Sequence, residues 1–187
     1  MNARDSATPS DPRIIHWLLH DGPRITDSTA FLNAFAGQLL LNGIDVARVS
    51  TGVPILHPQV FAFSGLWEAG KGASERRYLP NADMLSLLHH SPIKTVYEGN
   101  GPVRCDLTTP AVEGEYGIYA DLRKESFTDY FAIGVPFSDG SNKALTLATK
   151  RPGGFTADEA AKMFVDHPHF GIPQASIEVM PLKAMEG

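Results

Sequence analysis

Apolar side chains recur every three or four residues over the first forty positions, which is the spacing of helices that pack against a core. Asp11 followed by Pro12 is a helix-start signal, and apolar residues within 14–19 then form a stripe. Gly22 and Pro23 interrupt that stripe. The pattern therefore predicts a first helix that ends before residue 22.

A second helix is expected from Asp27 or Ser28, because either side chain can cap a first turn. Its apolar positions share one face and are Phe31, Leu32, Phe35, Leu39 and Leu40. Gly43 follows as a stop signal, since glycine accommodates the left-handed backbone that ends many helices. Two amphipathic helices thus come first.

The period changes to two from residue 44 onward. Alternation over residues 44–50 predicts a half-buried strand, which Gly52-Val53-Pro54 is expected to end. Residues 60–68 are rich in aromatic and β-branched side chains and predict a second strand. A polar surface loop over 71–83 and a short helix over 85–90 are expected to follow.

Two hairpins are predicted in the second half of the chain. Candidate strands at 93–97 and 103–107 flank Gly99-Asn100-Gly101, whose Asn-Gly step is a hairpin signal. Candidate strands at 130–137 and 144–149 flank a loop of turn-forming residues. Hairpin spacing of this kind favours an antiparallel sheet.

Two further helices are predicted around the second hairpin. The first covers residues 112–124, although Gly114 and Gly117 lie within it. The second opens at Thr156, because Glu159 three positions later completes a capping box.

The order of these elements predicts an α+β fold in which helices cover one face of an antiparallel sheet of about five to six strands. We expect a flexible leader at 1–12, a folded domain at 13–166 and an atypical C-terminal tail at 167–187. Prolines fragment that tail, so we expect it to be unnecessary for folding.

Composition narrows the class of protein. The 187 residues, 43% of them apolar, suffice for one domain with a sizeable core. The net charge is −5 and the basic residues are scattered, which argues against nucleic acid or an anionic membrane as partner. Apolar stretches are shorter than the roughly 20 residues of a membrane span, and Cys105 is the only cysteine. A cytoplasmic location is expected.

A set of short motifs, in this order, resembles the N-terminal regulatory regions of class III adenylate cyclases from rhizobia and related α-proteobacteria. The motifs are Trp17-Leu18-Leu19 with Gly22-Pro23-Arg24, residues 27–35, Leu56-His57-Pro58 ahead of Trp67, Ser91-Pro92, Thr128-Asp129-Tyr130, and Ala148-Thr149-Lys150-Arg151-Pro152-Gly153-Gly154-Phe155. The resemblance implies that residues 13–166 are a GAF/PAS-like sensor domain, and it leaves the ligand and cofactor of that domain open.

The chain departs from this family after Phe164. Prolines at 168 and 173 interrupt the helix that in the family continues toward the catalytic domain, and no cyclase catalytic motif is present to match. A truncated relative, a stand-alone copy and an excised domain all remain open. The resemblance implies a non-catalytic role in cyclic-nucleotide signalling, with a small-molecule ligand, a homodimer or a cyclase-type output domain as partners.

Polar groups at predicted strand ends beside aromatic residues suggest a ligand pocket between sheet and helices. These candidates are His57, Trp67, Arg104, Asp129 and Tyr130. The competing interpretation is that Trp67 and Tyr130 are core aromatics and that His57 with Pro58 makes a turn.

Other candidate chemistry is weaker. His16 and His20 share a helix face, and His167-Pro168-His169 pairs two imidazoles, but neither has a third ligand, so no metal site is expected. Cys105 is expected to be an inert, half-buried thiol. Residues 151–155 can be an anion-binding helix start or a glycine-dependent turn, and the turn is favoured.

Three hypotheses follow. The leading one is a non-catalytic sensor, supported by the resemblance and by the lack of a nucleophile elbow or phosphate-binding loop. The second is a small enzyme with His57 as general base and Asp129 or Arg104 as orienting group, which requires those side chains to lie within hydrogen-bond reach. The third is a dimerisation module that uses the apolar stripe of the first two helices.

Overall fold

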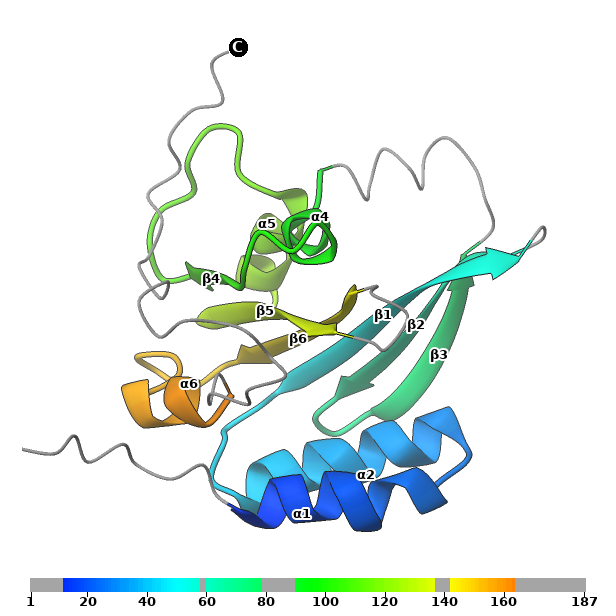
Figure 1. Cartoon of the computed structure of the whole chain (residues 1–187). Coiled ribbons are helices and arrows are strands. Elements are labelled where there is room, and N and C mark those ends of the chain that lie inside the picture. The colour runs from blue at the N-terminus through cyan, green and yellow to red at the C-terminus, as the bar shows by residue number, and fades with distance from the viewer. Residues whose placement is uncertain (1–11, 58–59, 79–89, 137–141, 164–187) are drawn as a thin grey trace, which may run out of the picture.

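The computed structural model describes residues 12–57, 60–78, 90–136 and 142–163, in which six antiparallel strands form one sheet in the order β3-β2-β1-β6-β5-β4 (Figure 1). The elements are α1 (Pro12–His20), η1 (Gly22–Arg24), α2 (Ser28–Leu41), β1 (Arg48–His57), β2 (Val60–Glu68), β3 (Gly72–Tyr78), α4 (Pro92–Tyr97), β4 (Val103–Asp106), α5 (Gly117–Lys124), β5 (Asp129–Pro136), β6 (Asn142–Thr149) and α6 (Ala157–Met163).

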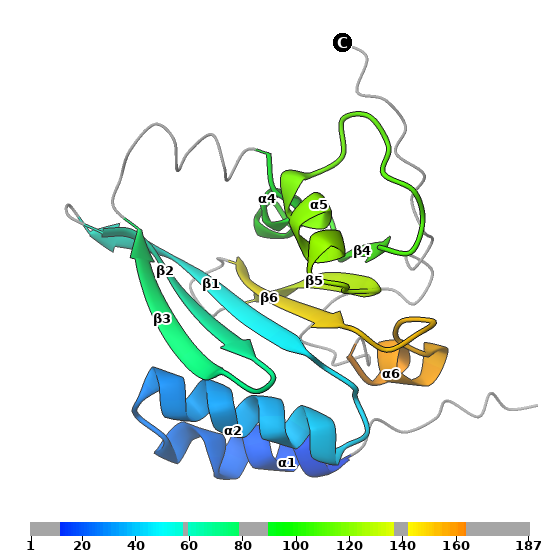
Figure 2. The same cartoon turned by 180° about the vertical axis from the view of Figure 1, so that it is seen from behind.

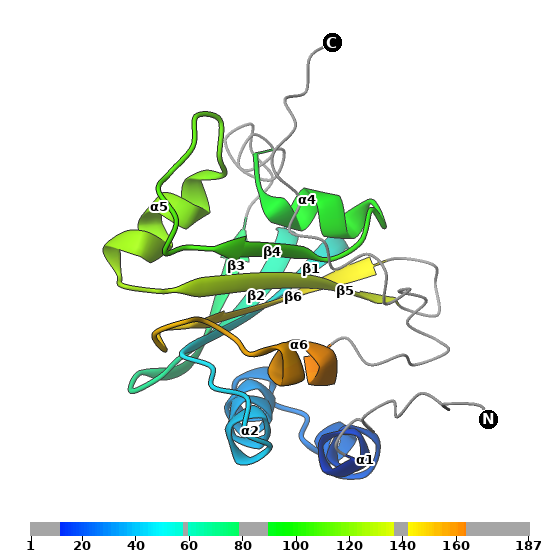
Figure 3. The same cartoon turned by 90° about the vertical axis from the view of Figure 1, so that its left-hand side faces the viewer.

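Helices lie on both faces of the sheet. Figure 3 shows α1, α2 and α6 on one side of the strands and α4 and α5 on the other. The view from behind shows α2 along the half of the sheet formed by β1, β2 and β3, with α4 and α5 beside the half formed by β4, β5 and β6 (Figure 2). The α+β class and the antiparallel sheet are confirmed, whereas the expectation that helices cover one face is wrong.

The first two helices begin and end where their sequence signals lie. Asp27 caps α2, because its Oδ1 accepts a hydrogen bond of 2.7 Å from the backbone N–H of Ala30. Gly43 stops the helix with a φ of +76°. Leu40 is the exception to the predicted apolar face, since it is 44% exposed. None of the helices in the described ranges is long and apolar enough to cross a membrane.

Strand alternation separates two hydrophobic cores. Residues Val49, Trp67, Phe131 and Leu147 face α1, α2 and α6, and they pack with Leu32, Phe35, Leu39 and Phe155. The alternate residues Tyr130, Ala132, Ala144 and Ala148 face α4 and α5, and they pack with Val96, Leu107, Tyr119, Leu122 and Phe127. Because successive side chains of a strand point to opposite faces, neighbours such as Tyr130 and Phe131 belong to different cores.

Phe35 anchors the α1–α2 hairpin to the first core. It is 8% exposed and stacks at 6.2 Å between ring centroids on Phe31 and at 6.5 Å on the half-buried Trp17. Replacing Phe35 with alanine is expected to lower the free energy of unfolding by about 3 kcal/mol, since a cavity forms in a packed core. Chemical denaturation would measure this. A loss below about 1 kcal/mol, the range of a surface substitution, would contradict the role.

Strand β1 is longer than its sequence pattern indicates. It starts at Arg48 and continues through Gly52, Val53 and Pro54 to His57, so the predicted break is absent. β1 pairs with β6 only over residues 48–52, whereas its pairing with β2 continues to His57. Proline lacks a backbone N–H, but beyond residue 52 one edge of β1 has no partner strand among the described residues, so the missing donor is tolerated there.

The polar segment after β2 is a strand and not a surface loop. β3 pairs with β2 over its whole length, from Gly72 opposite Glu68 to Tyr78 opposite Ala62. It lies at the edge of the sheet, where polar side chains such as Glu75 are suited to solvent. Its strand character comes from pairing with β2, which the composition of the segment does not indicate.

The predicted strand at 93–97 is helix α4. Ser91 caps it, with its Oγ accepting from the backbone N–H of Ile93 at 3.3 Å, and Pro92 occupies the first helical position. The predicted first hairpin is therefore wrong. Its other segment is confirmed as β4, which pairs with β5.

The remaining elements agree more closely with the sequence. β5 and β6 form the predicted second hairpin. α5 begins at Gly117, five residues later than expected, and α6 follows the predicted capping box. Of the predicted helix at 85–90 and the predicted leader at 1–12, only His90, which lies in a turn, and Pro12, which begins α1, are described, and the tail at 167–187 lies outside the described residues.

Candidate functional site

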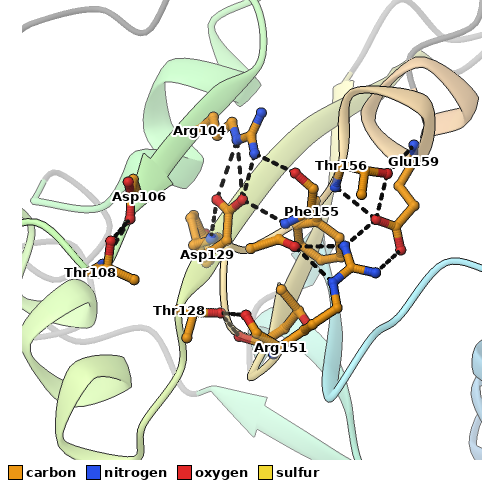
Figure 4. Close-up of polar contacts among 12 residues, drawn as sticks. Arg104, Asp106, Thr108, Thr128, Asp129, Arg151, Phe155, Thr156 and Glu159 are labelled. Atoms are coloured by element: carbon orange, nitrogen blue, oxygen red, sulfur yellow. Dashed lines mark hydrogen bonds and ion pairs between the residues drawn. The ribbon is translucent and has the colours of Figure 1, made fainter.

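A buried carboxylate, Asp129, joins three separate parts of the chain at the start of β5. Its side chain is 3% exposed and accepts hydrogen bonds from Arg104 Nη2 at 2.6 Å and Arg104 Nε at 3.2 Å (Figure 4). Backbone N–H groups of Tyr130 and Phe155 donate to it at 2.9 and 3.0 Å. Arg104 also donates to the Phe155 carbonyl at 2.9 Å. Strand β4, strand β5 and the turn before α6 are thereby fixed together.

Two glycines allow the turn at 151–155 to approach Asp129 this closely. Gly153 and Gly154 have φ values of +84° and +71°, a backbone region that favours glycine. A Cβ on Gly154 would lie 2.6 Å from Asp129 Oδ2. The turn interpretation of this motif therefore has a geometric basis, since both glycines are needed for the backbone to pack on a carboxylate.

A second ion pair ties the same turn to α6 and to the chain before β1. Glu159 accepts from Arg151 Nη1 at 3.0 Å and forms a shorter contact with Arg151 Nη2. It also accepts from the backbone N–H groups of Asp45 at 2.9 Å and Thr156 at 2.7 Å. Thr156 Oγ1 accepts from the Glu159 N–H at 3.2 Å, which completes the predicted capping box. Burial raises the pKa of Glu159, but these hydrogen bonds outweigh it and hold the pKa at about 2.

The two carboxylates are arranged to hold structure and not to transfer protons. Each accepts at least four hydrogen bonds, so few lone pairs remain for a substrate. A general base works best with a pKa near the operating pH, which Glu159 lacks. Arg104 and Asp129, predicted as ligand contacts, are instead partners of each other.

The depressed pKa of Glu159 predicts acid sensitivity. Its stabilising effect is complete above its ordinary pKa of 4.5 and is lost as the pH falls toward about 2. The stability advantage of the wild type over Glu159→Gln is expected to shrink by up to about 3 kcal/mol over this window. Urea unfolding of both proteins at pH 7, 5, 4 and 3 would measure it. A pH-independent difference would contradict the assignment.

The five predicted pocket residues do not lie together. Trp67, Arg104 and Asp129 lie on the α1, α2 and α6 side of the sheet, with Trp67 9% exposed in the core. Tyr130 faces the opposite side and is 4% exposed. His57 and Arg48 are the two ends of the ten-residue strand β1, about 30 Å apart at roughly 3.3 Å per residue.

This separation bears on the proposed acid–base site. Asp129 lies near the Arg48 end of β1. Its neighbour Tyr130 pairs with Ala148 on β6, and Ala148 pairs with Arg48 on β1. The backbone of His57 is thus at the far end of β1 from Asp129. The enzyme hypothesis requires His57 to lie within hydrogen-bond reach of Asp129 or Arg104. This strand register does not bring His57 near that pair.

A different polar set lies across the central strands on the α4 side of the sheet. Ser50 Oγ and Thr146 Oγ1 are 2.7 Å apart and link β1 to β6. Thr146 also lies close enough to the Tyr130 hydroxyl on β5 to lower the pKa of that group, but burial has the larger effect and raises the pKa of Tyr130 well above its usual range. Three hydroxyls thus run across three neighbouring strands. On the other face, the same strands carry Val49, Leu147 and Phe131.

Small residues continue this hydroxyl strip along β1 and β6. Gly52 pairs with Ala144, two positions beyond Ser50 and Thr146. The Tyr97 hydroxyl of α4 packs onto Gly52 so closely that a Cβ there would lie 2.7 Å from it. Burial raises the pKa of Tyr97 to about 12, so this hydroxyl is a proton-bearing donor at neutral pH.

Of this polar set, the sequence analysis identified Tyr130 alone. The available signal was the strand 144–149, whose side chains on one face, Ala144, Thr146 and Ala148, are small or carry a hydroxyl. Ser50 and Thr146 are 96 positions apart. Their contact depends on the pairing of β1 with β6, which the local pattern does not specify.

The other candidate chemistry is also located. Among the described residues no group of three metal-ligating side chains occurs. His16 and His20 lie on α1 with ring centroids 4.4 Å apart, and His167-Pro168-His169 lies outside the described ranges. Cys105 is half-buried on β4, and burial raises the pKa of its thiol to about 11. At neutral pH that thiol is protonated and weakly nucleophilic.

Comparisons with protein-family models and with curated proteins find no match. Among solved structures, the GAF domain of a two-component sensor histidine kinase from Bacillus halodurans is similar, with a TM-score of 0.53 and 12% identity, over 74% of this chain and 87% of that one. The nlh2 GAF domain of A. aeolicus in an inactive state gives a TM-score of 0.47 and 9% identity, over 82% and 85%. The chain has a GAF-like fold. The resemblance to adenylate cyclases stays a prediction.

Proposed function

We propose that this chain is a non-catalytic sensor module whose ligand site is the α4-side surface of β1 and β6. The observation that carries the proposal is the strip of hydroxyls across the central strands, Ser50, Thr146 and Tyr130, with the Tyr97 hydroxyl beside it. Where helices cover one face of a sheet, the central strands usually carry apolar side chains on that face, because buried polar groups need partners. The half-buried Ser50 and Tyr97 hydroxyls offer directional contacts to a small molecule, whereas Thr146 and Tyr130, 6% and 4% exposed, support Ser50 from below.

The position of the strip suggests how binding is transmitted. Tyr97 belongs to α4, whose main contacts are with β4, β5 and β6. A molecule bound beside Tyr97 contacts both α4 and β1, so its affinity depends on their spacing. It therefore shifts the population toward the arrangement that it fits better. In accordance with the resemblance, we propose cyclic-nucleotide signalling as the pathway and a cyclase-type domain as the output.

Native mass spectrometry of the protein purified from its own host tests this proposal. A retained small molecule that is lost in the variant Thr146→Val, but kept in a matched variant on the opposite face such as Thr149→Val, is the expected result. Circular dichroism of both variants would establish that they are folded. Turnover of a nucleotide or ester by the purified protein, abolished by Thr146→Val, would contradict a non-catalytic role.

A specific observation favours a second candidate, a dimerisation module built on α1 and α2. Leu19 and Leu41 are 65% and 76% exposed, and Leu18 and Leu40 are 37% and 44% exposed. Exposed apolar residues on two adjacent helices, here at the C-terminal end of each, suit an interface between copies. Sedimentation at increasing concentration tests it, and a monomer at all concentrations would contradict it. This candidate is compatible with a sensor, since dimer geometry is one form of output.

A further inference from the structure

The hydroxyl strip on β1 and β6 continues toward a cation. Arg48 is the first residue of β1 and lies on the α4 side of the sheet, two positions before Ser50. In the register it shares a row with Ala148 and Tyr130. Its charge is close enough to the Tyr130 hydroxyl to lower the pKa of that group, against the larger effect of burial. Arg48 and the three hydroxyls therefore belong to one surface.

The side chain of Arg48 is half-buried, yet in the described ranges its guanidinium forms no hydrogen bond or ion pair. This contrasts with Arg104, Arg123 and Arg151, each of which is paired with a carboxylate. Partial burial of a guanidinium without a partner costs free energy, because lost water contacts are not replaced. Such an unpaired cation is stabilised when an anion binds to it.

The acidic group nearest in the register does not fill this role. Glu68 lies opposite Arg48 on β2, but its Oε2 is 3.2 Å from Lys71 Nζ and no ion pair joins it to Arg48. Glu68 is thus paired with Lys71, and in the described residues no carboxylate forms an ion pair with Arg48.

The Tyr97 hydroxyl lies further along the same surface. In the described part of the chain this hydroxyl forms no hydrogen bond, and it packs beside Gly52, two positions beyond Ser50. The surface therefore has an unpaired cation near one end and an unpaired hydroxyl donor further along, with a hydroxyl chain between them. Donors of this kind suit an elongated molecule with an anionic group and a second acceptor.

We infer that the ligand of this sensor is a small organic anion whose carboxylate or phosphate binds Arg48 and whose second acceptor binds the Tyr97 hydroxyl. The inference rests on the proposed function and adds the chemical class of the ligand. A guanidinium can hold a carboxylate or a phosphate through two parallel hydrogen bonds, so the structure specifies the charge and not the element.

The test is thermal denaturation of the full chain with two pairs of probes that differ in charge. The pairs are succinate and succinamide, and adenosine 5′-monophosphate and adenosine. We expect at least one anion to raise the melting temperature while its neutral analogue does not, and the pair that responds distinguishes a carboxylate from a phosphate. Arg48→Gln is expected to weaken the binding of that anion by about 10- to 100-fold.

Two controls keep the outcomes distinct. Arg24→Gln removes an exposed arginine of η1 and is expected to leave the affinity unchanged. Arg48→Lys keeps the charge and is expected to restore part of the affinity. The melting temperature of each variant without probe establishes that it folds, and if Arg48→Gln does not fold, Arg48→Lys and Tyr97→Phe take its place, each expected to weaken binding severalfold.

The possible results test the inference and the proposed function separately. If a neutral analogue stabilises the protein as strongly as its anion, or if Arg48→Gln binds the anion as tightly as the wild type, the inference is overturned while a ligand sensor stands. If no probe binds and native mass spectrometry detects no retained molecule, both are overturned. Loss of anion binding in Arg48→Gln with retention in Arg24→Gln supports the inference.

Discussion

Replacing Asp129 with alanine is expected to lower the free energy of unfolding by about 5 kcal/mol, the largest effect of any substitution considered. The carboxylate is 3% exposed and holds Arg104 together with the backbone N–H groups of Tyr130 and Phe155. Its removal leaves two buried donors without an acceptor and a guanidinium that is only 28% exposed without its counter-charge. Urea unfolding at neutral pH would measure the loss.

Two variants serve as controls for the Asp129 prediction. Asp121→Ala removes a carboxylate from an exposed pair with Lys124, and its cost is expected to stay within about 0.5 kcal/mol. Arg104→Gln is expected to cost less than Asp129→Ala, because the carboxylate keeps its two backbone donors. A cost for Asp129→Ala no greater than that for Asp121→Ala would show that the cluster does not stabilise the fold.

The sequence correctly predicted elements that are stabilised by contacts between residues close in the chain. The Asp27 cap and the Thr156–Glu159 capping box each join residues three positions apart, so their spacing predicts them directly. The same reasoning was available at Ser91 and Pro92, which cap and begin α4. There the Asn-Gly step at 100–101 favoured a hairpin, and with it a strand at 93–97, over the helix-start signal.

The sequence pattern did not predict contacts between segments that are distant in the chain. β3 is a strand because β2 pairs with it, although its own residues suit a loop equally well. Arg104 and Asp129 meet because β4 and β5 are paired in a register that sets Arg104 opposite Phe131. The prediction named both residues as ligand contacts, since charged side chains at strand ends suggested a pocket. Their mutual ion pair could not be inferred without that register.

The Ser50–Thr146 contact shows the same limit for the candidate site. Each residue is unremarkable within its own strand, and only the β1–β6 pairing brings the two hydroxyls to 2.7 Å. The Gly153-Gly154 motif is the opposite case. Two consecutive glycines before a capping box indicated a turn by themselves, and the structure adds the reason why Gly154 in particular has no side chain.

Gly154→Ala is expected to lower the free energy of unfolding by roughly 4 kcal/mol, whereas Gly153→Ala is expected to cost about 1 kcal/mol. Both residues have a positive φ, +71° and +84°, so the backbone strain of an alanine is similar at the two positions. The difference is space, since a Cβ on Gly153 meets nothing within 4 Å, whereas one on Gly154 lies 2.6 Å from Asp129 Oδ2 and 2.9 Å from its Cβ.

Asp129 cannot move aside cheaply, because Arg104 and two backbone N–H groups hold its carboxylate. Relief of the contact therefore requires that the turn separate from β5, which breaks the hydrogen bond from the Phe155 N–H to Asp129. Urea unfolding of the two variants in parallel measures the difference in free energy of unfolding, with Gly153→Ala as the matched control for backbone strain. Equal losses in the two variants would show that strain alone accounts for the glycines, and that the turn does not depend on its contact with Asp129.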